Sequence, residues 1–251
     1  MKKITFLFSM LFLVAFPLKA IPDSLYDKAN KLYQDGHYEE AIEGYLSVIK
    51  VGYESSTLYY NLGNAFFRSN KLGKARLFYE KAIKLNPSDE DARANIQHLE
   101  GILADRFEEV PVIFYKKWIT SIFQFFSSDQ WAFASMIFFF LSVLAIIAYL
   151  LLRNILFRKF GFYSAIFLFA FSLLSMIASW KLNQLLRNPD SAVVTDLSVN
   201  VKSAPRETGT GLFVLHEGAK VWLEDKTGGW QEIRLSDGRK GWAPDDAIEA
   251  I

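Results

Sequence analysis

The stretch YYNLGNAFFRSNKLGKARLFYEKAIKLNP, residues 59–87, carries the strongest structural signal in the chain. A weaker copy of it lies 34 residues earlier. The matched positions are Ala29 with Gly63, Tyr33 with Phe67, Ala41 with Ala75, Tyr45 with Tyr79, and Ile49 with Ile83. Small residues at matched positions let paired helices approach closely, and Pro87 ends the last helix of the second copy. This pattern predicts two stacked helix–turn–helix repeats.

The period of 34 and the residues at these positions resemble the tetratricopeptide repeat. We therefore predict tetratricopeptide repeats with a capping helix over residues 22–107. The capping helix runs from Asp89 to about Phe107, and Ser88 or Asp89 is its N-cap. The resemblance implies a binding groove for peptides or partner helices, formed by the first helix of each repeat.

The expected partner-binding residues of the groove are aromatic or polar. They are Tyr26, Asn30, Tyr33, Gln34, Tyr60, Asn64, Phe67 and Arg68. Alternatively, some aromatics, Tyr33 and Phe67 in particular, only pack between helices. Some family members clamp a terminal carboxylate with Asn and Lys or Arg side chains. Here Asn30 and Asn61 occupy the Asn positions, whereas the cationic positions hold Tyr26, Ala94 and His98. This difference favours a more apolar ligand.

Two uncharged apolar runs follow the repeats. We predict transmembrane helices at residues 131–152 and 160–180, each long enough to cross a hydrocarbon core of about 30 Å. Neither contains the ionisable residues that carriers and pumps place near the membrane midplane, so we expect an anchor. Serines along both runs either help the helices pack or are ordinary helix residues.

The N-terminus predicts export. Lys2 and Lys3 precede an apolar run, so residues 1–20 have the pattern of a signal peptide, with an uncleaved anchor as the alternative. The basic loop from Arg153 to Lys159 favours the cytoplasmic side. Both soluble parts then lie in the periplasm, on the outer face of a bacterial inner membrane. Residues 111–128 have helical spacing of apolar side chains, which predicts an amphipathic helix in the interface or, alternatively, a helix packed on the repeats.

The last part of the chain, residues 191–251, changes to a strand pattern. The segments SVNVKSAP, LHEGAKVWL and GGWQEIRLSDGRKGWAP resemble bacterial SH3-like domains. The predicted fold is therefore a multidomain membrane protein: α-helical tetratricopeptide repeats, two transmembrane helices and a C-terminal all-β SH3-like barrel. Trp222 alternates with Val221 and Leu223, so we expect it to point outward as a partner-binding residue, unless a loop or the repeats cover it.

Residues that would support catalysis are missing from the sequence. It has no Cys, and His37, His98 and His216 lie far apart, so we predict no metal, no cofactor and no enzymatic activity. The flanking regions are acidic: residues 21–110 carry a net charge of −4, and residues 191–251 a net charge of −3. Acidic surfaces repel phosphate backbones, which argues against nucleic-acid binding.

The order of these parts (signal, repeats, two spans, SH3-like domain) resembles the E-type members of the Bacteroides aerotolerance (Bat) proteins. The resemblance implies an envelope complex linked to aerotolerance or stress, with von Willebrand A-domain proteins as partners and a linked MoxR-type ATPase. We predict a membrane-anchored scaffold that presents two protein-binding modules. The alternative is a cell-wall sensor that binds peptidoglycan through the SH3-like domain.

Overall fold

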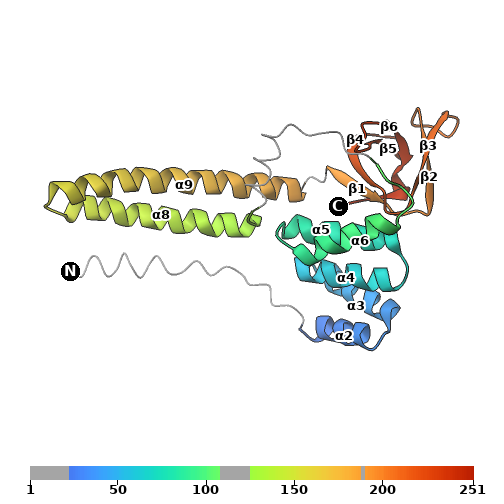
Figure 1. Ribbon diagram of the computed structural model, residues 1–251, viewed down its shortest axis with the longest axis horizontal. Coiled ribbons are helices and arrows are strands. Elements are labelled where there is room, and N and C mark those ends of the chain that lie inside the picture. Colours follow the sequence, from blue (N-terminus) through green and yellow to red (C-terminus); the bar gives the residue numbers. More distant parts are fainter. Residues whose placement is uncertain (1–22, 108–124, 188–189) are drawn as a thin grey trace. The chain divides into compact units, whose positions relative to one another are not determined.

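The computed structural model describes residues 23–107, 125–187 and 190–251 (Figure 1). The chain divides into two compact units, residues 1–54 and 55–251, and each is described by itself. The predicted signal peptide, residues 1–20, lies outside the described residues, as does most of the predicted interfacial helix, residues 111–128. The described end of that predicted helix is not helical, because Phe125 to Ser127 form a turn that leads into the next helix.

The first unit contains the helix pair α2 (Asp23–Gln34) and α3 (Tyr38–Lys50). Gly36 adopts a positive φ of 84° in the turn between them, a conformation that glycine allows without strain. The helices meet at Ala29 and Gly44: a Cβ built on Gly44 would lie 2.8 Å from the Ala29 Cβ. This close contact is the approach that the small residues of the repeat predict.

The second unit begins with α4 (Ser56–Arg68), α5 (Leu72–Leu85) and α6 (Glu90–Ile102). Ser55 caps α4 by accepting a hydrogen bond from the Leu58 amide. Of the two predicted caps of α6, Ser88 and Asp89, Asp89 is the one that accepts a hydrogen bond from the Ala92 amide. The capping helix ends at Ile102, earlier than predicted, and the chain continues from Leu103 to Phe107 without helical structure.

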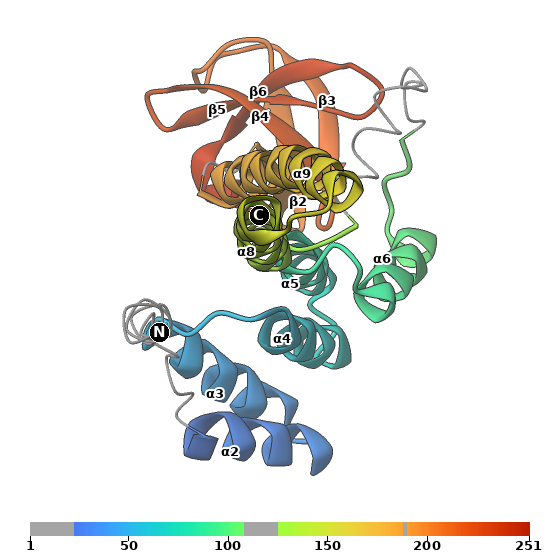
Figure 2. The same ribbon diagram turned by 90° about the vertical axis from the view of Figure 1, so that its left-hand side faces the viewer.

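Two long apolar helices form a hairpin: α8 (Ser128–Leu151) and α9 (Ile155–Arg187). They lie side by side in both views (Figures 1 and 2). Both are long and apolar enough to cross a membrane. α8 begins three residues before the predicted span at residues 131–152 and ends one residue before its end, whereas α9 extends beyond the span at residues 160–180 at both ends. Ser127 and Gln130 form a capping box at the start of α8.

Serines spaced seven residues apart join the two helices of the hairpin. The Ser135 hydroxyl donates to the Ser172 carbonyl at 3.0 Å, and the Ser172 hydroxyl donates back to the Ser135 carbonyl at 2.9 Å. One heptad on either side, Ser128 donates to the Ser179 carbonyl and Ser142 to the Ala165 carbonyl, each at 3.0 Å. A seven-residue repeat is the period of a left-handed helix pair, so these serines take part in helix packing.

The C-terminal part forms one seven-stranded antiparallel sheet with the order β3-β2-β6-β5-β4-β1-β7. The strands are β1 (Ser191–Val194), β2 (Ser198–Lys202), β3 (Gly211–His216), β4 (Lys220–Thr227), β5 (Trp230–Arg234), β6 (Lys240–Pro244) and β7 (Ile248–Ala250). Six of them overlap the strands that the sequence pattern predicts, at residues 192–194, 198–203, 213–215, 220–224, 230–235 and 241–244. β7, which follows a 3₁₀ turn at Asp245–Ala247, was not predicted.

The predicted barrel is wrong in its closure, because β3 and β7 are edge strands that do not pair with each other. Inside the sheet, β2 and β6 share a single paired position, Lys202 with Trp242. At one edge, Glu249 of β7 forms ion pairs with Lys74 and Lys81 of α5, so a helix rather than β3 contacts this strand.

Candidate functional site

The predicted groove residues of the first repeat lie on α2 and contact their own repeat. The Tyr45 hydroxyl donates to Asn30 Oδ1 at 2.8 Å, and the Tyr26 ring lies 6.0 Å from the Tyr45 ring. Tyr33 packs edge-on against Tyr38 at 5.5 Å, and Gln34 is exposed. Burial, with smaller contributions from Tyr26 and Tyr33, raises the pKa of Tyr45 above its ordinary value of 10.0, so its hydroxyl remains a donor.

The predicted residues of the second repeat lie on α4 and make the same contacts one period later. The Tyr79 hydroxyl donates to Asn64 Oδ1 at 2.7 Å, and the Tyr60 ring lies 6.0 Å from the Tyr79 ring. Phe67 is partly exposed and Arg68 is exposed. In both repeats, therefore, the asparagine of the first helix holds the buried tyrosine of the second helix.

The face of α4 continues onto α6 through Asn95, which the sequence analysis did not name, and His98, which it named only at a cationic position of the carboxylate clamp. Asn95 Nδ2 donates to Asn64 Oδ1 at 3.0 Å, and the His98 ring packs edge-on against Phe67 at 5.8 Å. We call Tyr60, Asn64, Phe67, Asn95 and His98 the α4–α6 face. Asn95 and His98 lie one period of 34 after Asn61 and Asn64, so extending the repeat onto the capping helix identifies them.

The opposite helix of this repeat, α5, packs on the sheet through charged and polar contacts. The Gly73 amide donates to Glu217 Oε2 at 3.0 Å, and Arg76 Nη1 donates to the Gly218 carbonyl at 3.0 Å. Lys84 Nζ donates to the backbone oxygen of Ile251 at 2.6 Å. We call this α5–sheet contact the seam. Arg76 is 9% exposed and Glu80 is 8% exposed, so both charges are buried there.

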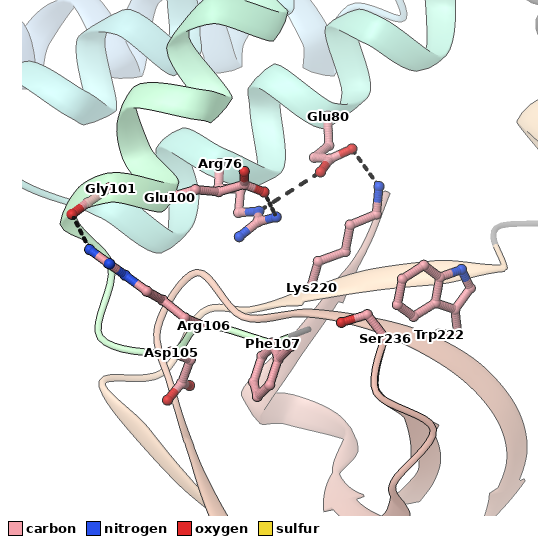
Figure 3. Close-up of a pocket in the computed structure, with 10 residues that line it drawn as sticks. All are labelled: Arg76, Glu80, Glu100, Gly101, Asp105, Arg106, Phe107, Lys220, Trp222 and Ser236. Atoms are coloured by element: carbon pink, nitrogen blue, oxygen red, sulfur yellow. Dashed lines mark hydrogen bonds and ion pairs between the residues drawn. The ribbon is translucent and has the colours of Figure 1, made fainter. Parts of the chain in front are cut away.

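A pocket of about 520 Å³ opens along the seam between α5, α6 and β4 (Figure 3). Its charged groups already have partners within the protein. Arg76 Nη2 donates to Glu100 Oε1 at 2.8 Å, and Lys220 Nζ donates to Glu80 Oε2 at 2.7 Å. Arg106 Nη2 donates to the Gly101 carbonyl at 3.0 Å. Of these contacts, Lys220 with Glu80 joins the repeat to the sheet. The lining carries three cations and three carboxylates, so the pocket has no excess of either charge.

Trp222 lies at the border of this pocket and is half-buried rather than fully exposed (Figure 3). Its other neighbour is Arg234, whose guanidinium carbon lies 5.5 Å from the ring centroid. The ring thus lines the same pocket as residues of α5 and α6, and its role as a partner-binding residue stays a prediction.

The segment after α6 fastens the repeat to the sheet. Leu103 packs closely against Gly218: a Cβ built on Gly218 would lie 2.6 Å from a Leu103 methyl carbon. Asp105 accepts from the His216 amide at 2.6 Å and contacts the His216 ring nitrogen Nδ1 at 2.9 Å. Phe107 packs against the core of the sheet and lies under Arg239. The sheet core thus includes a side chain from outside residues 191–251.

Comparison with known proteins assigns the helical region. Residues 26–90 match the tetratricopeptide repeat family. The repeat prediction is therefore confirmed, and it implies protein partners in general. The match includes neither the apolar helices nor the sheet. A search of curated proteins finds no match to the chain.

Proposed function

We propose that this chain is a membrane-anchored adaptor whose α4–α6 face binds a segment of a partner protein. The observation that carries the proposal is a polar and aromatic face on a matched tetratricopeptide repeat region. Such repeats bind extended or helical segments along their first helices, and α4 is the first helix of the second repeat.

The geometry of this face indicates the chemistry of its ligand. Asn64 Oδ1 already accepts two hydrogen bonds, from Tyr79 and Asn95, which fixes the orientation of the Asn64 amide. The Asn64 Nδ2 and Asn95 Oδ1 atoms are then a donor and an acceptor for a partner backbone. The rings of Tyr60, Phe67 and His98 flank them. This arrangement suits a segment with apolar side chains and an accessible backbone.

Membrane attachment would come from the α8–α9 hairpin, both of whose helices are long enough to span. A signal peptide followed by two spans would put the repeats and the sheet in the periplasm. The order of parts supports a Bat-type scaffold in a bacterial inner-membrane complex, with von Willebrand A-domain proteins as candidate partners and aerotolerance or stress as its setting. Anchoring raises the effective concentration of the binding face for neighbours in the same membrane.

The test is partner capture by the full chain after mild detergent extraction. Replacing both Asn95 and His98 by Ala removes two side chains of the face and one of the two hydrogen bonds to Asn64 Oδ1, while both partners of the Tyr79–Asn64 hydrogen bond remain. We expect recovery of the crosslinked partner to fall about tenfold, as for central interface residues. Gln97→Ala, an exposed position on the same helix, is the control. Equal recovery by the double variant and the control would rule out this face.

A second candidate, cell-wall binding by a domain of SH3-like type, is favoured by the half-buried Trp222 beside a pocket. Because Phe107 completes the core of the sheet, the full chain is needed for the test rather than residues 191–251 alone. Co-sedimentation with purified sacculi should be lost in Trp222→Ala if this function holds. If Trp222→Ala still co-sediments with sacculi, cell-wall binding through Trp222 is ruled out and the adaptor function is the remaining candidate.

A further inference from the structure

The turn of the α8–α9 hairpin concentrates positive charge without any counter-charge. Arg153, Arg158 and Lys159 lie at this end, whereas no Asp or Glu occurs anywhere between Asp129 and Asp190. Within the described residues, none of these three cations forms an ion pair with a carboxylate. All three side chains are exposed. Their counter-ions must therefore come from the surroundings.

A cavity of about 250 Å³ lies at the same end, and two of the cations line it. Its walls are Tyr149, Ile155, Arg158, Lys159, Phe162 and Tyr163. Arg158 is held in position by aromatic contact, since its guanidinium carbon lies 5.2 Å from the Tyr149 ring centroid. Tyr149 in turn packs on Phe162 at 5.7 Å. One wall of the cavity is thus cationic, and the rest is aromatic and apolar.

We infer that this cavity binds the headgroup of an anionic phospholipid, such as phosphatidylglycerol. An Arg fork and a Lys ammonium are the groups that proteins use to bind phosphate oxygens. The rings and Ile155 would contact the glycerol and the first part of an acyl chain, which a soluble phosphate does not have. The position fits, because Arg158 and Lys159 immediately precede the apolar run that begins at Phe160.

The inference rests on the proposed membrane location of the hairpin, and the two can be tested separately. Resistance of the full chain to alkaline carbonate extraction tests the location alone. The lipid site is tested by native mass spectrometry of the full chain from nanodiscs that contain phosphatidylcholine with or without phosphatidylglycerol. A chain that resists extraction but retains both lipids equally would overturn the lipid site and leave the membrane location intact.

Variants that remove one charge at each end of α9 provide a matched comparison. We expect Arg158→Gln to weaken phosphatidylglycerol retention about fivefold, and Arg158→Gln with Lys159→Gln about 25-fold. Lys181→Gln, which removes an exposed cation near the other end of the helix, should change retention less than about twofold. Equal losses in Arg158→Gln and Lys181→Gln would mean general electrostatic attraction and would overturn the site.

Inorganic phosphate separates a lipid site from a phosphate site. We expect phosphate in excess to leave the bound lipid in place, because it cannot replace the contacts of the acyl chain with Ile155 and Phe162. Complete displacement of the lipid by phosphate would show that the cavity recognises the anion alone, and the lipid assignment would then be wrong.

Discussion

The two repeats contain the same inner contacts but different outer residues. Asn30 with Tyr45 and Asn64 with Tyr79 are the same hydrogen bond one period apart. The seam residues of α5 differ from their counterparts in α3. Gly73, Arg76 and Glu80 correspond to Glu39, Ile42 and Leu46. The repeat pattern thus specifies how two helices of a repeat pack, whereas attachment to the sheet depends on positions that the pattern leaves open.

The largest expected effect comes from giving α5 the first repeat's residue at the centre of the seam. Arg76→Ile removes the guanidinium that joins Glu100 and the Gly218 carbonyl. The substitution also takes one partner from the buried Glu80 carboxylate, 3.8 Å from Arg76 Nε, and leaves the Gly218 carbonyl without its donor, which together costs about 3 kcal/mol. Hydrogen exchange of the full chain in detergent should show about 100-fold faster exchange in the α5 and β4 peptides.

Arg106→Ala is the control for that substitution. Arg106 borders the same pocket but is exposed and donates only to the Gly101 carbonyl among the contacts described. Its loss should change exchange in α5 and β4 by less than about 0.5 kcal/mol, as surface substitutions usually do. Equal exchange in Arg76→Ile and Arg106→Ala would mean that the seam does not depend on the buried charge.

The seam also shows where sequence reasoning reached its limit. The repeats and six strands have periodic signals, both apolar helices have long uncharged runs, and the structure contains all of these elements. The seam joins residues about 140 positions apart, such as Glu80 with Lys220, and charged residues on a helix surface ordinarily face water. β7 has three residues, too few to show alternation. Barrel closure was expected from family resemblance, which does not account for α5 at the sheet edge.

A second test of the seam is Gly73→Glu, which again places the first repeat's residue on α5. A Cβ at Gly73 would lie 3.0 Å from the Val194 carbonyl oxygen and 3.2 Å from the Glu217 Cβ, and the new carboxylate would face Glu217. Overpacking of this kind costs about 2 kcal/mol. This loss of stability is measured by hydrogen exchange in the peptide that contains β1 during chemical denaturation. Glu39→Ala, at the equivalent exposed position, should change stability by less than about 0.5 kcal/mol, and a similar loss there would contradict the assignment.

The close approach of the two helices within each repeat can be tested by substituting one glycine in each repeat. A Cβ at Gly63 would lie 2.6 Å from the Tyr79 ring, and one at Gly44 would lie 2.8 Å from the Ala29 Cβ. Gly63→Ala and Gly44→Ala should each destabilise their helix pair by about 1 kcal/mol, because overpacking outweighs the gain in helix propensity. Gly101→Ala has open space in α6 and should instead stabilise. Thermal unfolding that ranks all three alike would show that the close approaches relax freely.

The smallest expected effect concerns one lysine that occupies the same position in both repeats. Lys50 is exposed at the end of α3, whereas Lys84 is half-buried at the end of α5 and donates to the Ile251 oxygen. Burial lowers the pKa of Lys84 from its ordinary value of 10.5. Asp190 opposes this shift, and Lys81 and Lys220 add to it.

Because the folded-state pKa of Lys84 lies below the unfolded one, the unfolded chain binds more protons in the window between them. Stability should therefore rise with pH through that window up to 10.5, and the penalty for the charged, buried form is present below it. Lys84→Met should reduce this rise, by less than about 1 kcal/mol because the group is only half-buried. Lys50→Met separates loss of a charge from loss of the buried contact. Chemical denaturation of both variants across alkaline pH measures how the free energy of unfolding changes with pH. Identical pH dependence in the two variants would mean that the contact of Lys84 in the seam does not cause the rise.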